Sequence, residues 1–204
     1  MTEQEILESY TKRFNSYLSH LANVLENHIK EIVKDCPRID SVVARAKSIK
    51  SFTEKALKEK SGELLYTYPL IQIQDQIGVR IICHYKSDVN CIKDIVKEYF
   101  TDLEEQYKHP DDPKQFDYEG VHFIFYIPSD FRNPSLTENE CPKVFELQIK
   151  TLYQHAWAEA NHELGYKNEK KLEWEQKRKI AFTAAQSWGA DEIFDDLFHE
   201  LSNN

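Results

Sequence analysis

Long apolar runs are missing from this chain of 204 residues. No segment approaches the roughly 18 apolar residues that a membrane-spanning helix needs. The acidic start Met-Thr-Glu-Gln-Glu leads into no apolar stretch of a secretory signal. Internal repeats and low-complexity segments are also missing. These absences indicate a folded protein of the cytoplasm.

Paired cysteines are missing as well. The four cysteines, Cys36, Cys83, Cys91 and Cys141, form no Cys-x-x-Cys pair, and Cys83 and Cys91 stand among apolar residues. A small thiol packs well in such a setting. We therefore expect reduced cysteines with a structural role.

The chain also lacks an excess of positive charge. Its 26 basic and 35 acidic residues give a formal net charge of -9, which offers no overall attraction to nucleic acid or to an anionic membrane. A polyanionic ligand would have to be held by a local basic patch. Hydrophobic residues make up 41% of the sequence. That content suits one sizeable core, so we expect a single domain over residues 1–204 with one site.

Helical periodicity marks both ends of the chain. Apolar residues recur every three or four positions from Ile6 to Val33 and predict an amphipathic helix within the N-terminal segment 1–36. A second long helix is predicted from about Leu172 toward Leu201, inside a C-terminal helical extension over residues 168–204. Gly189 is a position where this helix can break.

Strands alternate with helices in the core, about residues 40–167. The patterns predict strands at residues 42–47, 79–85, 121–127 and 144–150, and helices at residues 48–60, 88–100 and 152–164, the last ended by Gly165. This alternation predicts an α/β or α+β fold, a mixed sheet of about five strands surrounded by helices.

Basic residues gather in one part of the chain. From Val42 to Lys60, six Lys or Arg residues stand against two Glu, a local excess of +4 in an acidic protein. The strand pattern places Arg45 and Lys47 on one face, and Lys50 and Lys55 follow. These cations could hold a triphosphate, although a basic helix surface is more often simply solvated.

Two carboxylates stand in unusual places. Asp75 precedes a turn with Gly78, where a carboxylate can bind Mg²⁺ or cap the turn. Glu146 lies in the middle of an otherwise apolar strand, which costs free energy unless the carboxylate faces solvent or a cation. Gln148 and Lys150 share its face. This face of the strand is therefore either solvent-exposed or part of a site.

An aromatic residue and a histidine follow a long polar loop. The loop runs from Lys108 to Glu119, and Tyr118 and His122 stand where it enters the next strand. A tyrosine in this place can stack on a purine base or close a small core.

Five separated motifs occur in order along the core. They are Arg45-Ala-Lys47-x-x-x-Ser51-x-x-x-Lys55, Asp75-Gln-Ile-Gly78-Val-Arg80-Ile81, Tyr118-Glu-Gly-Val-His122, Glu146-Leu-Gln148-Ile-Lys150-Thr151, and Ala156-Trp157-Ala158-Glu159-x-x-His162 with Tyr166-Lys167. Together they resemble the synthetase domain of RelA/SpoT proteins. An ordered set of this length does not arise readily by chance.

The resemblance implies a nucleotidyltransferase-like domain and a donor site. Such a domain transfers the β,γ-pyrophosphate of ATP to the 3′ hydroxyl of GTP or GDP with Mg²⁺, makes the alarmone (p)ppGpp and releases AMP. The implied donor residues are Arg45 and Arg80 around adenine, and Lys47, Ser51 and Lys55 on the ATP phosphates.

The resemblance also implies the catalytic and acceptor residues. Asp75 and Glu146 are the implied Mg²⁺ ligands and catalytic residues, and Glu146 is also placed to take the proton of the acceptor hydroxyl. The implied acceptor site comprises Lys114, Tyr118, His122, Gln148 and His155.

Several positions depart from the family pattern. Asp117 and Gly120 stand where the acceptor loop commonly has Gly and Ser. Lys150 stands where many members have Arg, and His155 where small synthetases often have Asn or Asp. The His-Asp pair of the family's hydrolase domain is also missing. We therefore expect synthesis without hydrolysis by a small stand-alone synthetase.

Other functions remain open at this point. A toxic small synthetase that pyrophosphorylates the 3′ end of tRNA and is silenced by an antitoxin is compatible with the altered loop, although the net charge of -9 disfavours a large RNA partner. Synthesis of (p)ppApp is a further option. A non-catalytic nucleotide sensor is disfavoured because it would need neither Asp75 nor Glu146. Assembly into a homo-oligomer is compatible with all of these.

Overall fold

A five-stranded mixed sheet forms the centre of the molecule. The computed structural model describes residues 1–133, 136–137, 140–167 and 172–202. Its sheet has the order β1 (Ile39–Ala46), β4 (Ile77–Cys83), β7 (Val144–Thr151), β6 (Gly120–Tyr126) and β5 (Asp102–Lys108). Strands β4 and β7 are parallel and the other neighbours are antiparallel. The fold is therefore the mixed α+β sheet that the sequence predicts.

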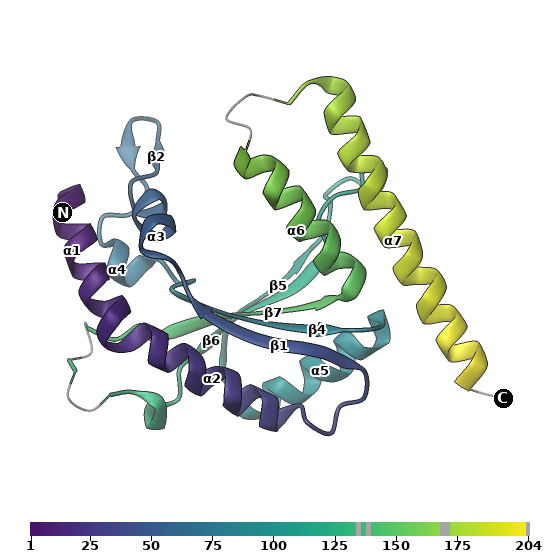
Figure 1. Cartoon of the computed structure of the whole chain (residues 1–204), viewed down its shortest axis with the longest axis horizontal. Coiled ribbons are helices and arrows are strands. Elements are labelled where there is room, and N and C mark those ends of the chain that lie inside the picture. Colours follow the sequence, from purple (N-terminus) through teal and green to yellow (C-terminus); the bar gives the residue numbers. More distant parts are fainter. Residues whose placement is uncertain (134–135, 138–139, 168–171, 203–204) are drawn as a thin grey trace.

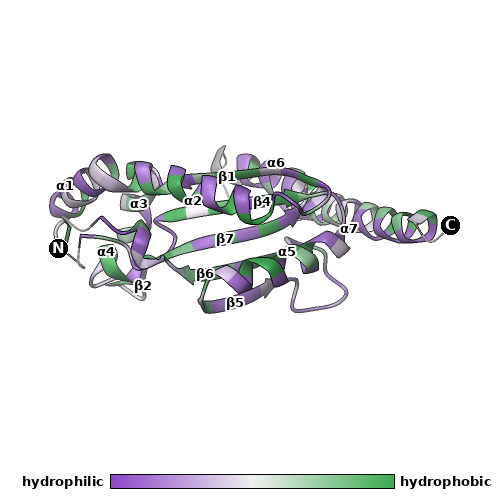
Figure 2. Ribbon diagram, turned by 90° about the horizontal axis from the view of Figure 1, so that it is seen from below, coloured by the Kyte–Doolittle hydropathy of each residue, from purple (hydrophilic) through white to green (hydrophobic). Residues whose placement is uncertain are grey.

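The two faces of this sheet differ in chemistry. On β7, Phe145, Leu147 and Ile149 are fully buried, and Phe123 and Phe125 of β6 lie on the same face. The helices α2 (Ser19–Ile32) and α5 (Lys86–Tyr99) cover this apolar face, as Figure 1 shows. The alternate residues of β7 are polar and face the other way. Figure 2 shows both hydrophobic and hydrophilic residues along this strand.

The N-terminal helical segment buttresses one corner of the sheet. It consists of α1 (Glu3–Arg13), a π-helical turn η1 (Phe14–Leu18) and α2, which confirms the predicted helix from Ile6 to Val33. Tyr10 stacks on Phe52 of α3 (Ile49–Ala56) with ring centroids 3.7 Å apart, and its hydroxyl donates to the Lys47 carbonyl at 2.8 Å. Arg13 donates to the carbonyl oxygen of Leu70, just after the start of α4 (Pro69–Gln72), at 2.7 Å.

The predicted helix over residues 48–60 is too long. Helix α3 ends at Ala56, and a small hairpin of β2 (Glu59–Lys60) and β3 (Glu63–Leu64) follows. Ser61 and Gly62 form its turn with φ angles of 57° and 84°. A two-residue turn with both φ angles positive matches the right-handed twist of a hairpin. The Ser-Gly dipeptide is the sequence signal for this turn.

Both expectations for glycines in the C-terminal helices are wrong. Helix α6 (Leu152–Lys167) continues past Gly165, and α7 (Trp174–Ser202) runs through Gly189 without a break. A glycine inside a helix costs only about 1 kcal/mol relative to alanine, which packing on either side can offset. No helix in the described ranges is both long and apolar enough to cross a membrane.

Helix α7 is attached to the end of β7 by a buried carboxylate. Thr151 donates its hydroxyl to Asp191 Oδ2 at 2.7 Å, and Asp191 is only 3% exposed. Burial is the main reason that the pKa of Asp191 is raised to about 6. The ammonium of Lys86 lowers this pKa and the carboxylates of Glu119 and Glu192 raise it further.

We expect Asp191→Asn to change how stability depends on pH. Because the native pKa of about 6 lies above the ordinary value, Asp191 contributes most stability at low pH and loses it as the pH rises through 6. The asparagine variant should therefore gain up to about 2 to 3 kcal/mol relative to the wild type between pH 4 and pH 7.5. Urea unfolding at several pH values measures this, and a constant difference between the two proteins would contradict it.

Candidate active site

The polar face of the sheet brings the expected site residues together. Strand register places Arg80 beside Gln148, and Gln148 opposite His122. Glu146 lies beside Gly78, which pairs with Arg45 on the outer strand β1. Side chains of paired residues share a face of the sheet. Four strands thus contribute side chains to one surface.

A chain of hydrogen bonds joins Glu146 to the acceptor-loop tyrosine. His122 Nδ1 lies 2.9 Å from Glu146 Oε1, and His122 Nε2 lies 2.6 Å from the hydroxyl of Tyr118. An imidazole that donates from Nδ1 to the carboxylate accepts from the phenol at Nε2. This arrangement fixes one tautomer of His122 and links Tyr118 to Glu146.

The Glu146 carboxylate remains ionised although it is largely removed from solvent. Burial raises its pKa, but the hydrogen bond from His122 and the electrostatic attraction of that ring outweigh burial and leave the pKa below its ordinary value. Gln148 acts in the same direction as His122. The same surroundings raise the pKa of Tyr118, through burial first and the charge of Glu146 second. At neutral pH the site therefore holds a carboxylate beside a neutral phenol.

Gly120 makes the inward position of Tyr118 possible. A Cβ atom at residue 120 would lie 2.6 Å from the Tyr118 hydroxyl and 3.1 Å from Cζ. Lys150 supports the ring from the other side, with its ammonium 4.6 Å from the ring centroid, within the range of a cation–π contact. The departure from the family's serine thus has a structural consequence, because any side chain at this position would displace the tyrosine.

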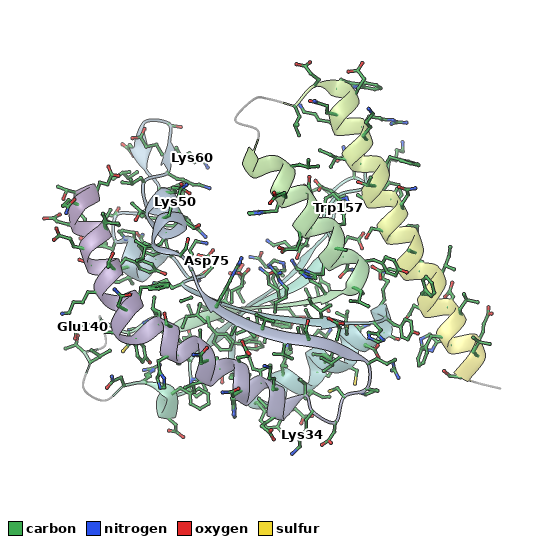
Figure 3. All side chains as sticks on the ribbon, in the orientation of Figure 1. Lys34, Lys50, Lys60, Asp75, Glu140 and Trp157 are labelled. Atoms are coloured by element: carbon green, nitrogen blue, oxygen red, sulfur yellow. The ribbon has the colours of Figure 1, made fainter. Side chains whose placement is uncertain are left out.

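Asp75 lies between two lysines. Lys47 Nζ donates to Asp75 Oδ2 at 2.9 Å, and Lys55 Nζ forms an ion pair with Oδ1 at 3.0 Å. Burial raises the pKa of Asp75, but the two ammonium groups more than offset this and keep the pKa below its ordinary value. Figure 3 shows Asp75 between α3 and the sheet.

The start of α3 places backbone hydrogen-bond donors near these two lysines. Ser48 caps the helix by accepting from the Ser51 amide at 3.2 Å, and its hydroxyl donates to the Ser51 hydroxyl at 2.9 Å. A helix N-terminus favours anions, since its amides and dipole point outward. Lys47, Ser51 and Lys55 therefore meet at one corner, as expected for phosphate ligands. Lys47 reaches it from just beyond β1, which ends at Ala46.

One cleft contains both carboxylates. Its volume is about 200 Å³, and its walls include Lys55, Asp75, His122 and Glu146. Strand β5 also lines it through Glu104, Gln106 and Lys108, which sequence reasoning missed together with the strand itself. The alternation of these three residues is the signal that could have identified them, because residues two apart on a strand share a face.

Arg80 is held at the edge of this face by two residues of α6. Its Nη1 atom lies 2.8 Å from Glu159 Oε1 and 3.3 Å from His155 Nδ1. Burial and the charge of Arg80 lower the pKa of His155. The structure thus places His155 against an expected ATP residue, and its expected acceptor role stays a prediction.

Lys114 stands apart from the other expected residues. It is exposed in the loop before Tyr118, where its backbone amide donates to Asp112 Oδ1 at 2.9 Å. The expected residues that line the cleft are Lys55, Asp75, His122 and Glu146; Lys114 is not among them, and neither are Tyr118, Gln148 and His155. Its assignment to the acceptor site stays a prediction as well.

The chain is similar to known proteins over most of its length. Residues 44–171 match the family described as the region found in RelA / SpoT proteins. The chain is 25% identical to GTP pyrophosphokinase YjbM of Bacillus subtilis over 173 residues, which cover 84% of this chain and 77% of that protein.

Solved structures share the fold. The small alarmone synthetase 1 from Bacillus subtilis bound to its product pppGpp has a TM-score of 0.76 at 21% identity, and the match covers 94% of this chain and 97% of that one. The same synthetase bound to AMPCPP has a TM-score of 0.71 at 20% identity, with 97% and 98% covered. The whole arrangement of sheet and helices is therefore common to these proteins.

We expect Lys150 to lose its proton at an unusually low pH for a lysine. Burial, followed by repulsion from Arg80, lowers its pKa to about 8. Arg80→Met should raise this pKa only part of the way toward the ordinary value, because burial remains. NMR titration of isotope-labelled lysines in the free protein measures both values. A wild-type Lys150 that titrates only above about pH 10, the ordinary range, would contradict the environment described here.

Proposed function

The chain belongs to the RelA/SpoT family, and from this membership we propose that it transfers the β,γ-pyrophosphate of ATP to the 3′ hydroxyl of GTP or GDP. The products would be AMP and (p)ppGpp. The observation that carries the proposal is the position of Glu146, a charged carboxylate on the polar face of a central strand, in one cleft with Asp75 and with Lys55 of α3. Such a group requires a ligand or a cation, and nucleotide phosphates with a metal ion supply both.

The donor nucleotide would lie at the corner formed by α3 and β1. Lys47, Ser51 and Lys55 would hold its phosphates, while Arg45 and Arg80 would pack on the two faces of adenine. Arg45 pairs with Gly78 and Arg80 pairs with Val43, so the arginines lie diagonally on adjacent strands and the same face. A guanidinium stacks well on an aromatic ring. The complex of the Bacillus synthetase with AMPCPP supports a donor of this chemistry.

Mg²⁺ suits the donor set of the cleft. Asp75 and Glu146 offer carboxylate oxygens, which this ion prefers, and it typically takes one or two carboxylates together with substrate phosphates. The described residues contain no group of three or more His, Cys, Asp or Glu that could hold a metal ion. When bound, the ion would neutralise phosphate oxygens. The two lysines now on Asp75 would then be free to turn toward the phosphates.

The acceptor would lie against Tyr118, His122 and Gln148. Its 3′ oxygen would attack the β-phosphorus of ATP, a new O–P bond would form, and the bond from that phosphorus to the AMP oxygen would break. AMP leaves with the electron pair, and Glu146 takes the hydroxyl proton. His122 keeps the carboxylate oriented, since it is hydrogen-bonded to Oε1. In-line positioning and charge neutralisation supply most of the rate in phosphoryl transfer.

Two other acceptors, tRNA and ATP, are alternatives to the guanine nucleotide. The departures at Asp117 and Gly120 alter the acceptor loop and are compatible with tRNA as the acceptor, in which case an antitoxin partner would be expected. Synthesis of (p)ppApp would follow if ATP also served as acceptor. Assembly of several copies is compatible with each of these. We favour the guanine nucleotide, because the similar YjbM protein is named a GTP pyrophosphokinase and a solved synthetase of the same fold was bound to pppGpp.

We predict that Glu146→Gln abolishes pyrophosphate transfer without unfolding the protein. The amide keeps the shape of the side chain and removes the charge that a metal ion and the leaving proton need. Incubation of the wild type with labelled ATP, Mg²⁺ and, separately, GDP, GTP, ATP or deacylated tRNA would identify the acceptor. Asp75→Asn should behave like Glu146→Gln. Near wild-type transfer by both variants, with circular dichroism unchanged, would contradict the catalytic roles of the two carboxylates, whereas a wild type that transfers pyrophosphate to none of these acceptors would favour a nucleotide sensor.

We predict that His155→Asn changes acceptor choice more than total turnover. Neutral imidazole offers one donor and one acceptor, a pattern that differs from that of an amide. The ratio of pppGpp to pppApp formed from mixed GTP and ATP, measured by chromatography, reports the choice. Because His155 touches Arg80, the other outcome is informative: an unchanged ratio with a raised KM for ATP would place His155 in the donor site.

A further inference from the structure

The loop that carries Tyr118 is tied to the C-terminal helix by one aromatic contact. We call residues 109–119 the acceptor loop. Residues 111–117 are all exposed, and their hydrogen bonds join loop residues to one another. Phe116 differs from these residues because its side chain packs outside the loop. Its ring centroid lies 5.6 Å from that of Trp188 on α7, at an interplanar angle of 57°. Aromatic pairs at this separation attract each other.

The end of the acceptor loop meets the same part of α7. Glu119 is half-buried, and burial raises its pKa, which the nearby Lys86 ammonium lowers and the Glu192 carboxylate raises. Lys86 forms an ion pair with Glu192 and also lies 6.0 Å from the Trp188 ring centroid. The loop end, the start of α5 and the middle of α7 therefore form one junction.

The same face of this stretch of α7 also contacts the end of β7, the strand that bears Glu146. Asp191, one turn after Trp188, accepts from the Thr151 hydroxyl at 2.7 Å. Thr151 follows Lys150 directly and also caps α6, since its hydroxyl accepts from the Gln154 amide at 3.1 Å. Asp195 fixes α7 to α5 by accepting from the Ser87 amide at 2.9 Å. The anchored helix thus touches both the acceptor loop and the end of β7.

We propose that α7 holds the acceptor loop in a fixed position relative to β7, and that Trp188 is the positioning residue for acceptor binding. The proposal rests on the proposed function, because it takes the acceptor loop to bind the acceptor base through Tyr118. Trp188 lies outside the cleft and touches Phe116 rather than any reacting group. It acts by limiting the conformations of the loop.

The physical basis is the cost of ordering an exposed loop. A free loop must lose backbone freedom when the acceptor binds, and each residue that becomes fixed adds to this entropic cost. A loop that is already packed on a rigid helix has lost part of that freedom beforehand, so the acceptor binds more tightly. The donor corner lies at α3 and does not depend on this loop. Loss of the contact should therefore weaken acceptor binding and leave ATP binding unchanged.

The test compares Trp188→Ala with Trp188→Phe and with Ile193→Ala, a matched control at an exposed apolar residue of the same helix. Hydrogen exchange of the free protein comes first. We expect faster exchange of residues 109–119 in Trp188→Ala, and wild-type exchange in the control. Unchanged exchange of the acceptor loop in Trp188→Ala would overturn the proposal. This step needs no nucleotide, so its result is independent of the proposed function.

Steady-state kinetics and calorimetry then separate the two substrates. Trp188→Ala should raise the KM and the Kd for GTP about 2 to 10-fold, the range expected for one aromatic pair. The KM for ATP should stay unchanged, and Trp188→Phe should stay within about twofold of the wild type because a ring remains. An equal rise in both KM values would overturn the proposal. If the wild type bound GTP but transferred no pyrophosphate, the proposed function would fail, while the GTP Kd would still test the role of Trp188.

A double variant tests whether Trp188 acts through Phe116. If it does, Phe116→Ala should raise the GTP KM as Trp188→Ala does, and Phe116→Ala/Trp188→Ala should be no worse than either single variant. Fully additive effects would show that the two rings act separately, which would overturn the assigned route.

Discussion

A charged carboxylate inside a central strand is the constraint on which the rest of the site depends. Burial of Glu146 alone would raise its pKa, and the hydrogen bond from His122 reverses that tendency. The need to solvate this charge explains why the neighbouring positions on the same face are Gln148, Lys150 and Arg80. An apolar helix packed on this face would bury its charged groups without partners, which costs free energy. A cleft therefore stays open on one side of the sheet, while α2 and α5 seal the other.

The two ends of the chain support opposite parts of the site. Tyr10 and Arg13, near the N-terminus, hold the backbone at Lys47 and Leu70, on either side of the corner that contains Asp75. Asp191 holds the end of β7 from the C-terminal helix. Figure 1 shows these terminal helices on opposite sides of the molecule. Residues far from the cleft thus fix the geometry of the residues inside it.

The sequence predicted most of the sheet but not the contacts across it. Alternation along residues 144–150 identified the strand and its polar row, since a period of two is a strong signal when one face is apolar. Strand β5 escaped prediction because both of its faces carry polar residues. The hydrogen bond between Tyr118 and His122 depends on the register of β6 and on the absence of a side chain at Gly120. Both are features of the three-dimensional structure that the sequence pattern does not show. The acceptor roles of Lys114 and His155 remain predictions.

The alternation along β7 has an evolutionary consequence. Phe145, Leu147 and Ile149 belong to the core, while Glu146, Gln148 and Lys150 lie on the polar face of the sheet, and all six lie within one strand of eight residues. A substitution at Gln148 changes the polar face beside the cleft without opening a cavity in the apolar core. Ligand preference can therefore drift between lineages while the scaffold is inherited intact, and neighbouring codons are exposed to different selective pressures.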